Sequence, residues 1–398
     1  MLKQLSFVFS LIIFCSAFPG CFTKDKAGLP CLGAGEKNDL EWINQFIGQS
    51  NDHKAVIQEC AVVALAAGGS AASSVGDNSG SGGNGSGGGD GSGSGSSSGT
   101  CTLGTWNSVS APENNTWSTV TYGGGRFVAV SGDGTNRIMT STDGTNWTGM
   151  SAPENNGWLS VAYGGGEFAA VAATGTNRIM TSPDGVSWTV LAAPENNFWS
   201  KIAYGGGKFA ALASDGTNRI MTSSDGITWA VAAAPVNNNW STVTYGGGKF
   251  VALTGSTATN QVMTSSDGIS WAAGSSAEPN NWSGVTYGKG MYVAVAHGGA
   301  NLIMTSQDAV SWTSVPAPED LDWWSVAYGG GRFVAVANSM GVAGTPTGNY
   351  IMTSSDGASW TTVAAPENNA WNFVTYGDGK FVAVAATGTN RIMTATCL

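Results

Sequence analysis

The sequence predicts an all-β protein, a seven-bladed β-propeller of four-stranded blades whose ring is closed by an N-terminal strand. Two observations predict this class. A Trp recurs at steps of 41 or 42 residues, with a final step of 48, at these positions: Trp117, Trp158, Trp199, Trp240, Trp282, Trp323 and Trp371. Each unit also contains four short strand-like runs separated by turn residues. Four strands in each repeat, seven times over, are typical of propeller blades and not of helical solenoids.

The first unit shows the expected strands of a blade. They are the runs WSTVTY, RFVAVS, RIMTST and NWTGM, which start at Trp117, Arg126, Arg137 and Asn146. The Gly-rich stretch before Arg126 and the Asp-Gly pair before Asn146 suit tight hairpin turns. Alternate connections of an up-and-down blade emerge on opposite faces of the ring. We therefore expect these two kinds of turn on one face and the remaining loops on the other.

The two ends of the repeat region predict ring closure. The seventh unit stops at Leu398 with three strands, and the segment around Trp106 supplies a lone fourth. This strand would complete the last blade and remove an unpaired edge. Cys101 and Cys397 would then lie on adjacent strands near one turn, which predicts a disulfide between them.

The N-terminus predicts export. Lys3 precedes an apolar run over residues 5–18, which is short for a membrane span and suits a signal peptide over residues 1–20. Cys21 follows a stretch that resembles a loose bacterial lipobox, so lipidation of Cys21 and ordinary secretion are the two alternatives. The expected location is the cell surface or outer membrane as a lipoprotein, or the medium.

Two segments separate this signal from the repeats. Residues 21–67 predict a small helical unit, with Cys31 and Cys60 as disulfide candidates among three connectivities. Residues 68–100 are almost entirely Gly, Ser, Asn and Asp, which predicts a flexible linker. The propeller then covers residues 101–398, and we expect it to be monomeric.

A repeated turn motif carries a family resemblance. The pattern Ser141-x-Asp143-Gly144-x-x-Trp147 resembles the Asp-box of sialidase-type (BNR) propellers, in a variant one residue shorter between Asp and Gly. The repeats also resemble those of uncharacterised exported bacterial and phage proteins, which implies the propeller fold and no reaction. We expect a structural role for the Asp-box carboxylates, as acceptors of backbone N–H groups: Asp143, Asp184, Asp225, Asp267, Asp308 and Asp356.

The loop face opposite these turns is rich in amides and arginine. Asn offers a donor and an acceptor, and an aromatic ring offers a flat apolar surface, which together suit sugars. The alternative is that Asn satisfies backbone groups in loops. The ligand-binding candidates are Asn114, Asn115, Arg137, Asn155, Asn156, Arg178, Asn196, Asn197, Arg219, Asn368, Asn369, Arg391 and Trp324.

Blades four to six depart from the repeat. The repeated Arg becomes Gln261, Leu302 and Tyr350. Blade six also carries an acidic group, for which a Ca²⁺ site, a sugar site and a solvated loop are the alternatives: Glu319, Asp320 and Asp322. No other cofactor is expected.

The composition argues against two classes of function, nucleic-acid binding and catalysis. A net charge of -10 argues against a nucleic-acid groove, and the only two His, His53 and His297, lack an evident catalytic partner. An active sialidase needs three converging Arg, whereas nearly every Arg here occupies an equivalent repeat position. We therefore expect no enzyme.

Three functional hypotheses remain. The first is an exported, surface-anchored recognition module with multivalent binding to carbohydrate. The second is a structural or protein-interaction scaffold, and the third is a sialidase-like glycoside hydrolase. The expected partner is a glycan or a cell-surface protein, with membrane contact only through an N-terminal lipid.

Overall fold

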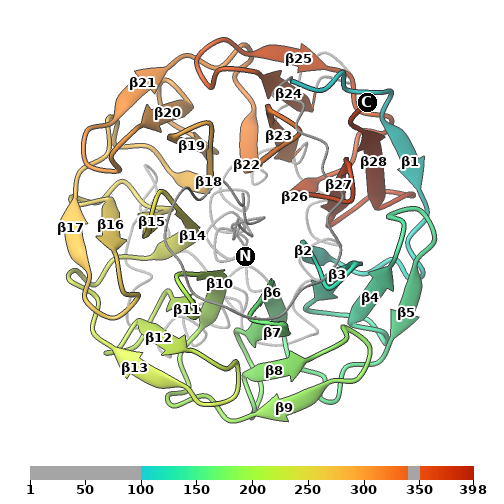
Figure 1. Cartoon of the computed structure of the whole chain (residues 1–398), viewed down its shortest axis with the longest axis vertical. Coiled ribbons are helices and arrows are strands. Elements are labelled where there is room, and N and C mark those ends of the chain that lie inside the picture. The colour runs from blue at the N-terminus through green and yellow to red at the C-terminus, as the bar shows by residue number, and fades with distance from the viewer. Residues whose placement is uncertain (1–99, 339–349) are drawn as a thin grey trace, which may run out of the picture. The chain divides into compact units, whose positions relative to one another are not determined.

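The protein forms a ring of seven four-stranded antiparallel sheets, seen end-on in Figure 1. This computed structural model describes residues 100–338 and 350–398. The predicted all-β, seven-bladed architecture is confirmed. The signal peptide, the helical unit with Cys31 and Cys60, the linker and Cys21 lie outside the described residues. Among the described residues, no helix is long and apolar enough to span a membrane.

The strands of each blade follow one another from the centre of the ring outwards (Figure 1). The innermost strands start at or beside the repeated Trp: β2 (Trp117–Gly123), β6 (Trp158–Gly164), β10 (Trp199–Gly205), β14 (Trp240–Gly246), β18 (Trp282–Gly288), β22 (Asp322–Gly329) and β26 (Trp371–Gly377). The second strands are β3 (Arg126–Ser131), β7 (Glu167–Ala172), β11 (Lys208–Ala213), β15 (Lys249–Thr254), β19 (Met291–Ala296), β23 (Arg332–Asn338) and β27 (Lys380–Ala385).

The outer half of each blade has shorter strands. The third strands are β4 (Ile138–Ser141), β8 (Ile179–Ser182), β12 (Ile220–Ser223), β16 (Val262–Ser265), β20 (Ile303–Ser306), β24 (Ile351–Ser354) and β28 (Ile392–Thr396). The edge strands are β5 (Thr148–Met150), β9 (Thr189–Leu191), β13 (Ala230–Ala232), β17 (Ala272–Gly274), β21 (Thr313–Val315), β25 (Thr361–Val363) and β1 (Asn107–Val109). Blades 1 to 6 begin at β2, β6, β10, β14, β18 and β22, and blade 7 begins at β26.

The ring closes through the N-terminal strand, as predicted. In blade 7 the strand order is β1-β28-β27-β26, so the first strand of the chain pairs with the last. Cys101 and Cys397 form a disulfide, with their Cα atoms 5.3 Å apart. The N–H of Cys101 also donates to the carbonyl of Gly330 in blade 6 at 2.8 Å. The start of the propeller is therefore fixed to two blades.

The core lies between the blades. The repeated Trp side chains are all fully buried, and each indole N–H donates to a backbone carbonyl, as Trp117 does to Glu113 at 3.2 Å. Each sheet packs against a neighbour on both sides, so the second strands read as continuous buried runs such as RFVAVS of β3. Burial on both faces explains why these strands do not alternate apolar and polar residues.

A Tyr of each blade packs directly on a Gly of the preceding blade. A Cβ on Gly205 would lie 1.9 Å from the ring of Tyr245, and one on Gly164 would lie 2.0 Å from the ring of Tyr204. The same contact occurs at the other five blade junctions, including that of Tyr122 with Gly377. Glycine is therefore required here for close approach.

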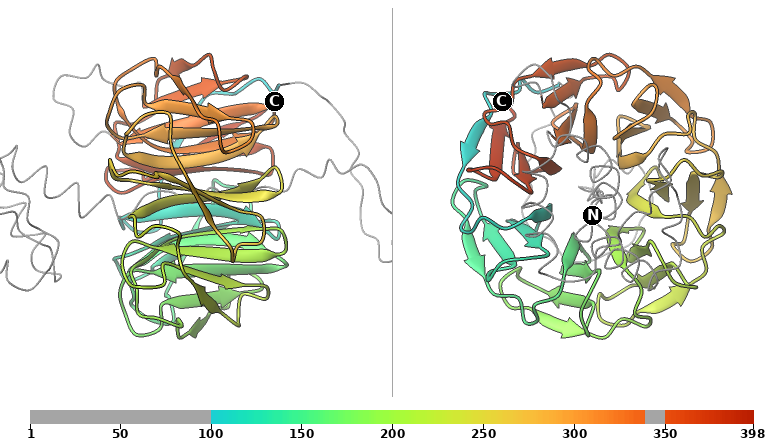
Figure 2. Two further views of the ribbon diagram at one scale, coloured as in Figure 1. Left: turned by 90° about the vertical axis from the view of Figure 1, so that its left-hand side faces the viewer. Right: turned by 180° about the vertical axis from the view of Figure 1, so that it is seen from behind.

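The ring has two faces, at the right and left of the edge-on view in Figure 2. We call the face that carries the first-to-second and third-to-fourth strand turns the turn face, and the opposite one the loop face. On the turn face, the Nζ of Lys380 donates to the carbonyl of Asp143 at 2.8 Å, which joins the two kinds of turn. The C-terminus also lies there, because the N–H of Cys397 donates to the carbonyl of Gly379.

We predict that Gly205→Ala destabilises the protein by about 3 kcal/mol, because a methyl group must displace the Tyr245 ring from a packed junction. Gly274→Ala is the control, since its Cβ would meet no atom closer than 3.7 Å. Urea unfolding followed by Trp fluorescence measures both. Equal midpoints for the two variants would contradict the proposed constraint.

We predict that replacing both Cys101 and Cys397 by Ser lowers the free energy of unfolding by up to about 5 kcal/mol. The reason is that the disulfide closes a loop with a sequence separation of 296 and restricts the unfolded chain. The measurement is the urea midpoint with and without a reductant. A wild-type midpoint that does not move on reduction would show that the disulfide adds nothing to ring closure.

Candidate recognition site on the loop face

A glutamate organises the loops of most blades. The Glu113 carboxylate accepts the backbone N–H groups of Thr135 and Asn136, at 3.1 and 3.0 Å, and the Nδ2 of Asn136 at 2.6 Å. The bond from the Asn136 N–H is the largest cause of the lowered pKa of Glu113. Equivalent bonds link these pairs: Glu154 with Asn177, Glu195 with Asn218, Glu278 with Asn301 and Glu367 with Asn390.

The repeated Arg joins loops of neighbouring blades. Arg137 is 5% exposed, and its Nη1 donates to the carbonyls of Asn155 and Asn156 at 2.9 and 2.7 Å. Burial lowers the pKa of Arg137, although Asp133 opposes this shift. Arg178, Arg219 and Arg391 make equivalent bonds. The donors that sequence reasoning offered to a ligand are therefore engaged within the scaffold.

The paired Asn residues divide into two classes. The second Asn of each pair is buried and bonds a neighbouring loop; Asn115, for example, donates to the carbonyl of Asn136 at 2.7 Å. The others in this class are Asn156, Asn197 and Asn369. The first Asn of each pair is exposed: Asn114, Asn155, Asn196 and Asn368. The structure does not bring these exposed residues together, because each lies in a different blade.

Blade 4 lacks the glutamate tie and carries a different residue in place of the arginine. Val236 replaces the glutamate, and the exposed Asn260 side chain makes no hydrogen bond within the described part of the chain. Asn260 also has a positive φ of 57°. Gln261 replaces the Arg and retains part of its role, since its Nε2 donates to the carbonyl of Asn280 at 2.8 Å.

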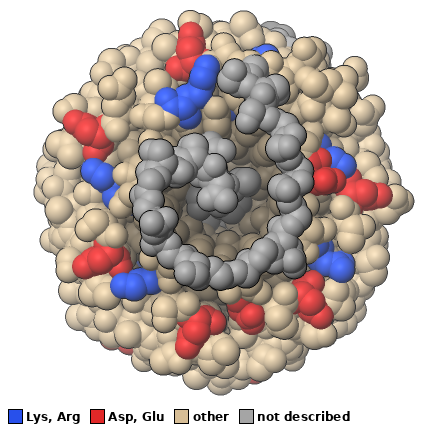
Figure 3. Space-filling model, viewed as in Figure 1, with Lys and Arg blue, Asp and Glu red and all other residues tan. Residues whose placement is uncertain are grey.

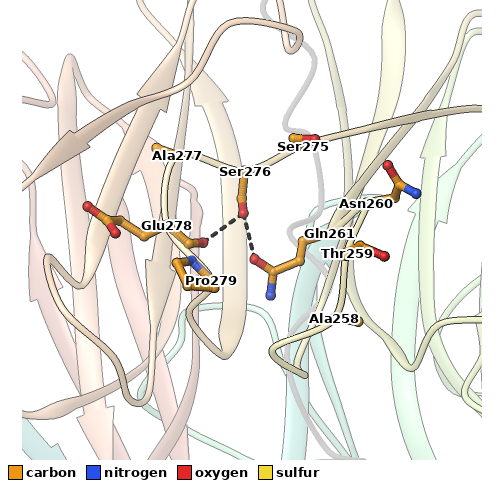
Figure 4. Close-up of a pocket in the computed structure, with 9 residues that line it drawn as sticks. All are labelled: Ala258, Thr259, Asn260, Gln261, Ser275, Ser276, Ala277, Glu278 and Pro279. Carbon is orange, nitrogen blue, oxygen red and sulfur yellow. Dashed lines mark hydrogen bonds between the residues drawn. The ribbon is translucent and has the colours of Figure 1, made fainter.

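A shallow hollow of about 250 Å³ lies at this altered position. Its lining residues are Ala258, Thr259, Asn260, Gln261, Ser275, Ser276, Ala277, Glu278 and Pro279. Figure 4 shows Asn260 and Glu278 on opposite sides of it, with Ser276 between them. The Ser276 hydroxyl bonds the Gln261 Oε1 at 2.5 Å and the Glu278 carbonyl at 2.7 Å. The hollow thus has a fixed floor and polar walls.

Blade 5 carries a second hollow, of about 240 Å³, at the equivalent position. Here Leu302 replaces the Arg and is buried. The lining residues are Gly299, Ala300, Asn301, Leu302, Pro316, Ala317, Glu319 and Asp320. In the first hollow the Glu278 carboxylate points away from Ser276 and accepts bonds from Asn301 and Ser314 (Figure 4). Neither hollow is lined by an aromatic side chain, so neither offers a flat surface for a sugar ring.

The aromatic and acidic residues of blade 6 do not form an open site. Trp324 is 6% exposed and stacks on His297, with ring centroids 4.8 Å apart and an interplanar angle of 12°. Burial lowers the pKa of His297 to about 4. Within the described ranges, no group of three or more His, Cys, Asp or Glu side chains is placed to hold a metal ion. Glu319, Asp320 and Asp322 therefore do not converge on a Ca²⁺ site.

The Asp-box residues lie on the turn face, one in each of six blades. The Oδ1 of Asp225 accepts the N–H groups of Ile227 and Thr228 at 2.8 and 2.7 Å. These bonds, with that from Thr228 the largest cause, lower the pKa of Asp225 to about 2. Equivalent bonds occur at Asp143, Asp184, Asp267, Asp308 and Asp356. They stabilise turns and share no common centre.

These features define a seven-bladed propeller with a loop face altered in blades 4 to 6. No family model matches the chain, and no curated protein matches its sequence. Its fold is similar to that of virginiamycin B lyase from Staphylococcus aureus, at 12% identity and a TM-score of 0.63, over 75% of this chain and 99% of that chain. It is also similar to YCF48 bound to D1 peptide, at 14% identity and a TM-score of 0.57, over 76% of this chain and 99% of that one.

The expectation that this protein is not an enzyme is contradicted by the first comparison. A lyase has the same architecture over nearly its whole length, so the propeller does not exclude catalysis. The Arg residues occupy equivalent repeat positions, which argues against a sialidase. This argument does not exclude other enzymatic reactions. Identities of 12% to 14% show the fold alone and assign no reaction.

Sequence reasoning noted Gln261, Leu302, Glu319 and Asp320 but missed the hollows that they line and the role of Val236. The sequence contained a signal for the altered loops of blade 4, because Val236 replaces the glutamate and Gln261 replaces the arginine of the same blade. That joint loss indicates that the two residues belong to one loop network. Asn260 is at the position of the Asn that bonds this glutamate in other blades, and in blade 4 the glutamate is absent.

We predict that Asp322→Asn stabilises the protein at pH 7.5. Burial, with a smaller effect of Asp320, raises the pKa of Asp322 to about 6 in the folded state, above the usual value of 3.8. The fold favours the neutral carboxyl group of Asp322, so its contribution to the free energy of unfolding is complete below about pH 4. This contribution is lost as pH rises through about 6 and the buried group ionises, whereas Asn stays neutral. The melting temperatures should differ at pH 7.5 and coincide at pH 4. A constant difference across this range would contradict the shift.

Proposed function

We propose that this protein is a recognition module that binds an extended, basic polypeptide segment through the loop face of blades 4 and 5. The observation that carries this proposal is the pair of hollows at equivalent positions in adjacent blades, where Gln261 and Leu302 replace the repeated Arg. A segment that runs from one blade to the next would meet both.

The chemistry of the hollows supports a basic peptide. Glu319 and Asp320 line the second hollow, and Glu278, whose carboxylate also accepts bonds from Asn301 and Ser314, stands at the edge of the first. Carboxylates at the edge of an interface attract a cationic partner and select against an anionic one. The exposed amide of Asn260 offers the donor and acceptor that a peptide backbone requires.

The comparison with YCF48 is consistent with this proposal, because that propeller is known with a bound peptide. Multivalent carbohydrate binding is supported less well. The Arg side chains and half of the Asn side chains on which it depends bond other loops, and the hollows have no aromatic lining. The proposed location is extracellular, on the basis of residues 1–20, and a relation to Asp-box propellers stays a prediction.

We predict that Glu278→Gln with Asp320→Asn weakens binding of a basic peptide about tenfold, because two charges at the hollows are lost. The probe is a fluorescent twelve-residue peptide of alternating Lys and Ser, with a Glu and Ser peptide as its counterpart. Fluorescence polarisation at low salt gives both affinities. The protein is the chain from residue 21 onward.

The matched control is Glu154→Gln with Glu195→Gln. It changes the net charge equally, at the positions that correspond to Glu278 in blades 2 and 3, where Asn177 and Asn218 hold the carboxylates as Asn301 holds that of Glu278. Equal weakening by both pairs would reduce the effect to net charge and contradict the site. Saturable binding to a glycan array without peptide binding would favour the carbohydrate hypothesis instead.

A further inference from the structure

Four exposed aliphatic side chains occupy one repeat position on the turn face. They follow the Asp-box turns of blades 2 to 5 and are 44%, 57%, 49% and 68% exposed, respectively: Val186, Ile227, Ile269 and Val310. Thr145 and Ala358 stand at this position in blades 1 and 6. The apolar turn tips therefore form one uninterrupted arc of consecutive blades.

The fold does not explain these side chains. The N–H of Val186 donates to the Asp184 carboxylate at 2.8 Å, and the N–H of Thr145 makes the same bond to Asp143 at 2.8 Å. The turn thus uses only the backbone of this residue. Exposed β-branched aliphatic residues are not favoured in turns, so their recurrence in four blades indicates a contact with something apolar.

The geometry of the ring determines the shape of the surface that these side chains can contact. Equivalent positions of successive blades lie at a common height and radius, so the four tips are coplanar. They are separated from one another by polar turn residues, and neither hollow described above lies among them. The neighbouring inner turns end in Gly166, Gly207 and Gly248, where a Cβ would meet no atom within 4 Å, so these inner turns are themselves open to solvent. Several separate coplanar tips are contacted together by a flat, deformable surface.

We propose that the turn face of blades 2 to 5 lies on a zwitterionic lipid bilayer, with these four side chains inserted at the headgroup boundary. Insertion of apolar side chains at this depth is favourable, and its strength grows with the apolar area buried. This proposal concerns the face opposite the peptide site and does not depend on it.

The charges of this face fit zwitterionic headgroups. Lysines of one blade reach the Asp-box turn of the next: Lys208 Nζ donates to the carbonyl of Asp267 at 3.2 Å, and Lys249 Nζ to that of Asp308 at 3.1 Å. Lys289 similarly bonds the carbonyl of Ser355. Each of these cations therefore lies at the Asp-box turn of the next blade, bonded to its backbone. Figure 3, which shows the face that carries the C-terminus, has acidic and basic side chains side by side around much of the ring and adjoining acidic groups along its lower edge. In blade 2, Glu167 stands at the position of Lys208 and Lys249.

The course of the chain agrees with this orientation. Cys101, near the start of the described residues, lies on the turn face beside Gly330. The expected export signal and the lipidation candidate Cys21 precede it in the chain.

The test measures flotation with vesicles of pure phosphatidylcholine. The protein is the chain from residue 21 onward, the expected exported product, with Cys21→Ser so that no lipid is attached. We expect it to float with the vesicles. We expect the quadruple variant V186T, I227T, I269T and V310T to partition at least about tenfold less. Thr is the residue that blade 1 uses at this position, so the turns are retained.

Two further variants make the result specific. Val231→Thr removes an aliphatic side chain of the edge strand β13 that is 36% exposed, and we expect it to leave partitioning unchanged. Thr145→Val extends the arc into blade 1 and should increase partitioning. Near-ultraviolet circular dichroism shows that each variant is folded.

The outcomes separate this proposal from its rivals. It is overturned if the parent protein fails to float, if the quadruple variant floats equally well, or if flotation requires phosphatidylglycerol. The last result would indicate adsorption through lysines alone. None of these results bears on peptide binding at the loop face, which uses different residues.

Discussion

The contact between successive innermost strands is the constraint on which the rest of this structure depends. Each Tyr ring occupies the volume that a Cβ on the preceding blade's glycine would need, as Tyr204 does at Gly164. The next blade can therefore approach only in one orientation. The fully buried Trp of each innermost strand fills the other end of the same junction. Because the junction is repeated seven times, its angle fixes the number of blades.

Polar ties complete these junctions on both faces. Arg137 joins the loops of blades 1 and 2, and Arg391 joins those of blades 7 and 1 by donating to the carbonyl of Asn115. Lysines such as Lys249 make comparable bonds between turns. The polar residues repeated most faithfully are thus engaged by the scaffold. Specific recognition requires positions where this network is interrupted, and blade 4, with Val236 and Gln261, is the clearest interruption.

Much of the fold was predictable from sequence because repetition reduces it to one unit. The period of the Trp residues predicts the blades, and the lone segment at Trp106 predicts the closing strand that pairs with β28. The side to which each turn belongs follows from strand parity. None of these steps needs a distance between side chains.

The site was less predictable because it depends on which groups remain available after folding. Asn114 and Asn115 are adjacent residues of the same type, so the sequence does not distinguish them. Only Asn115 donates to the carbonyl of Asn136 and is buried. Trp324 suggests an aromatic binding surface. It falls at the bulge of β22, between Trp323 and Ser325, and stacks on His297 instead. The same bulge follows the repeated Trp in every blade, and the sequence alone does not show that it buries the side chain at this position.

The two faces of the ring differ in how they depart from the repeat, and this difference separates their roles. On the loop face, departures remove ties and open hollows, which suits a partner with particular chemistry. On the turn face, the two backbone N–H bonds to each Asp-box carboxylate are kept while the exposed residue after the turn varies, as in Ile227 and Thr145. Variation confined to the outward side chain leaves stability unchanged and alters only what the face contacts. A propeller can in this way carry a selective surface and an adhesive one without compromising the junctions that close it.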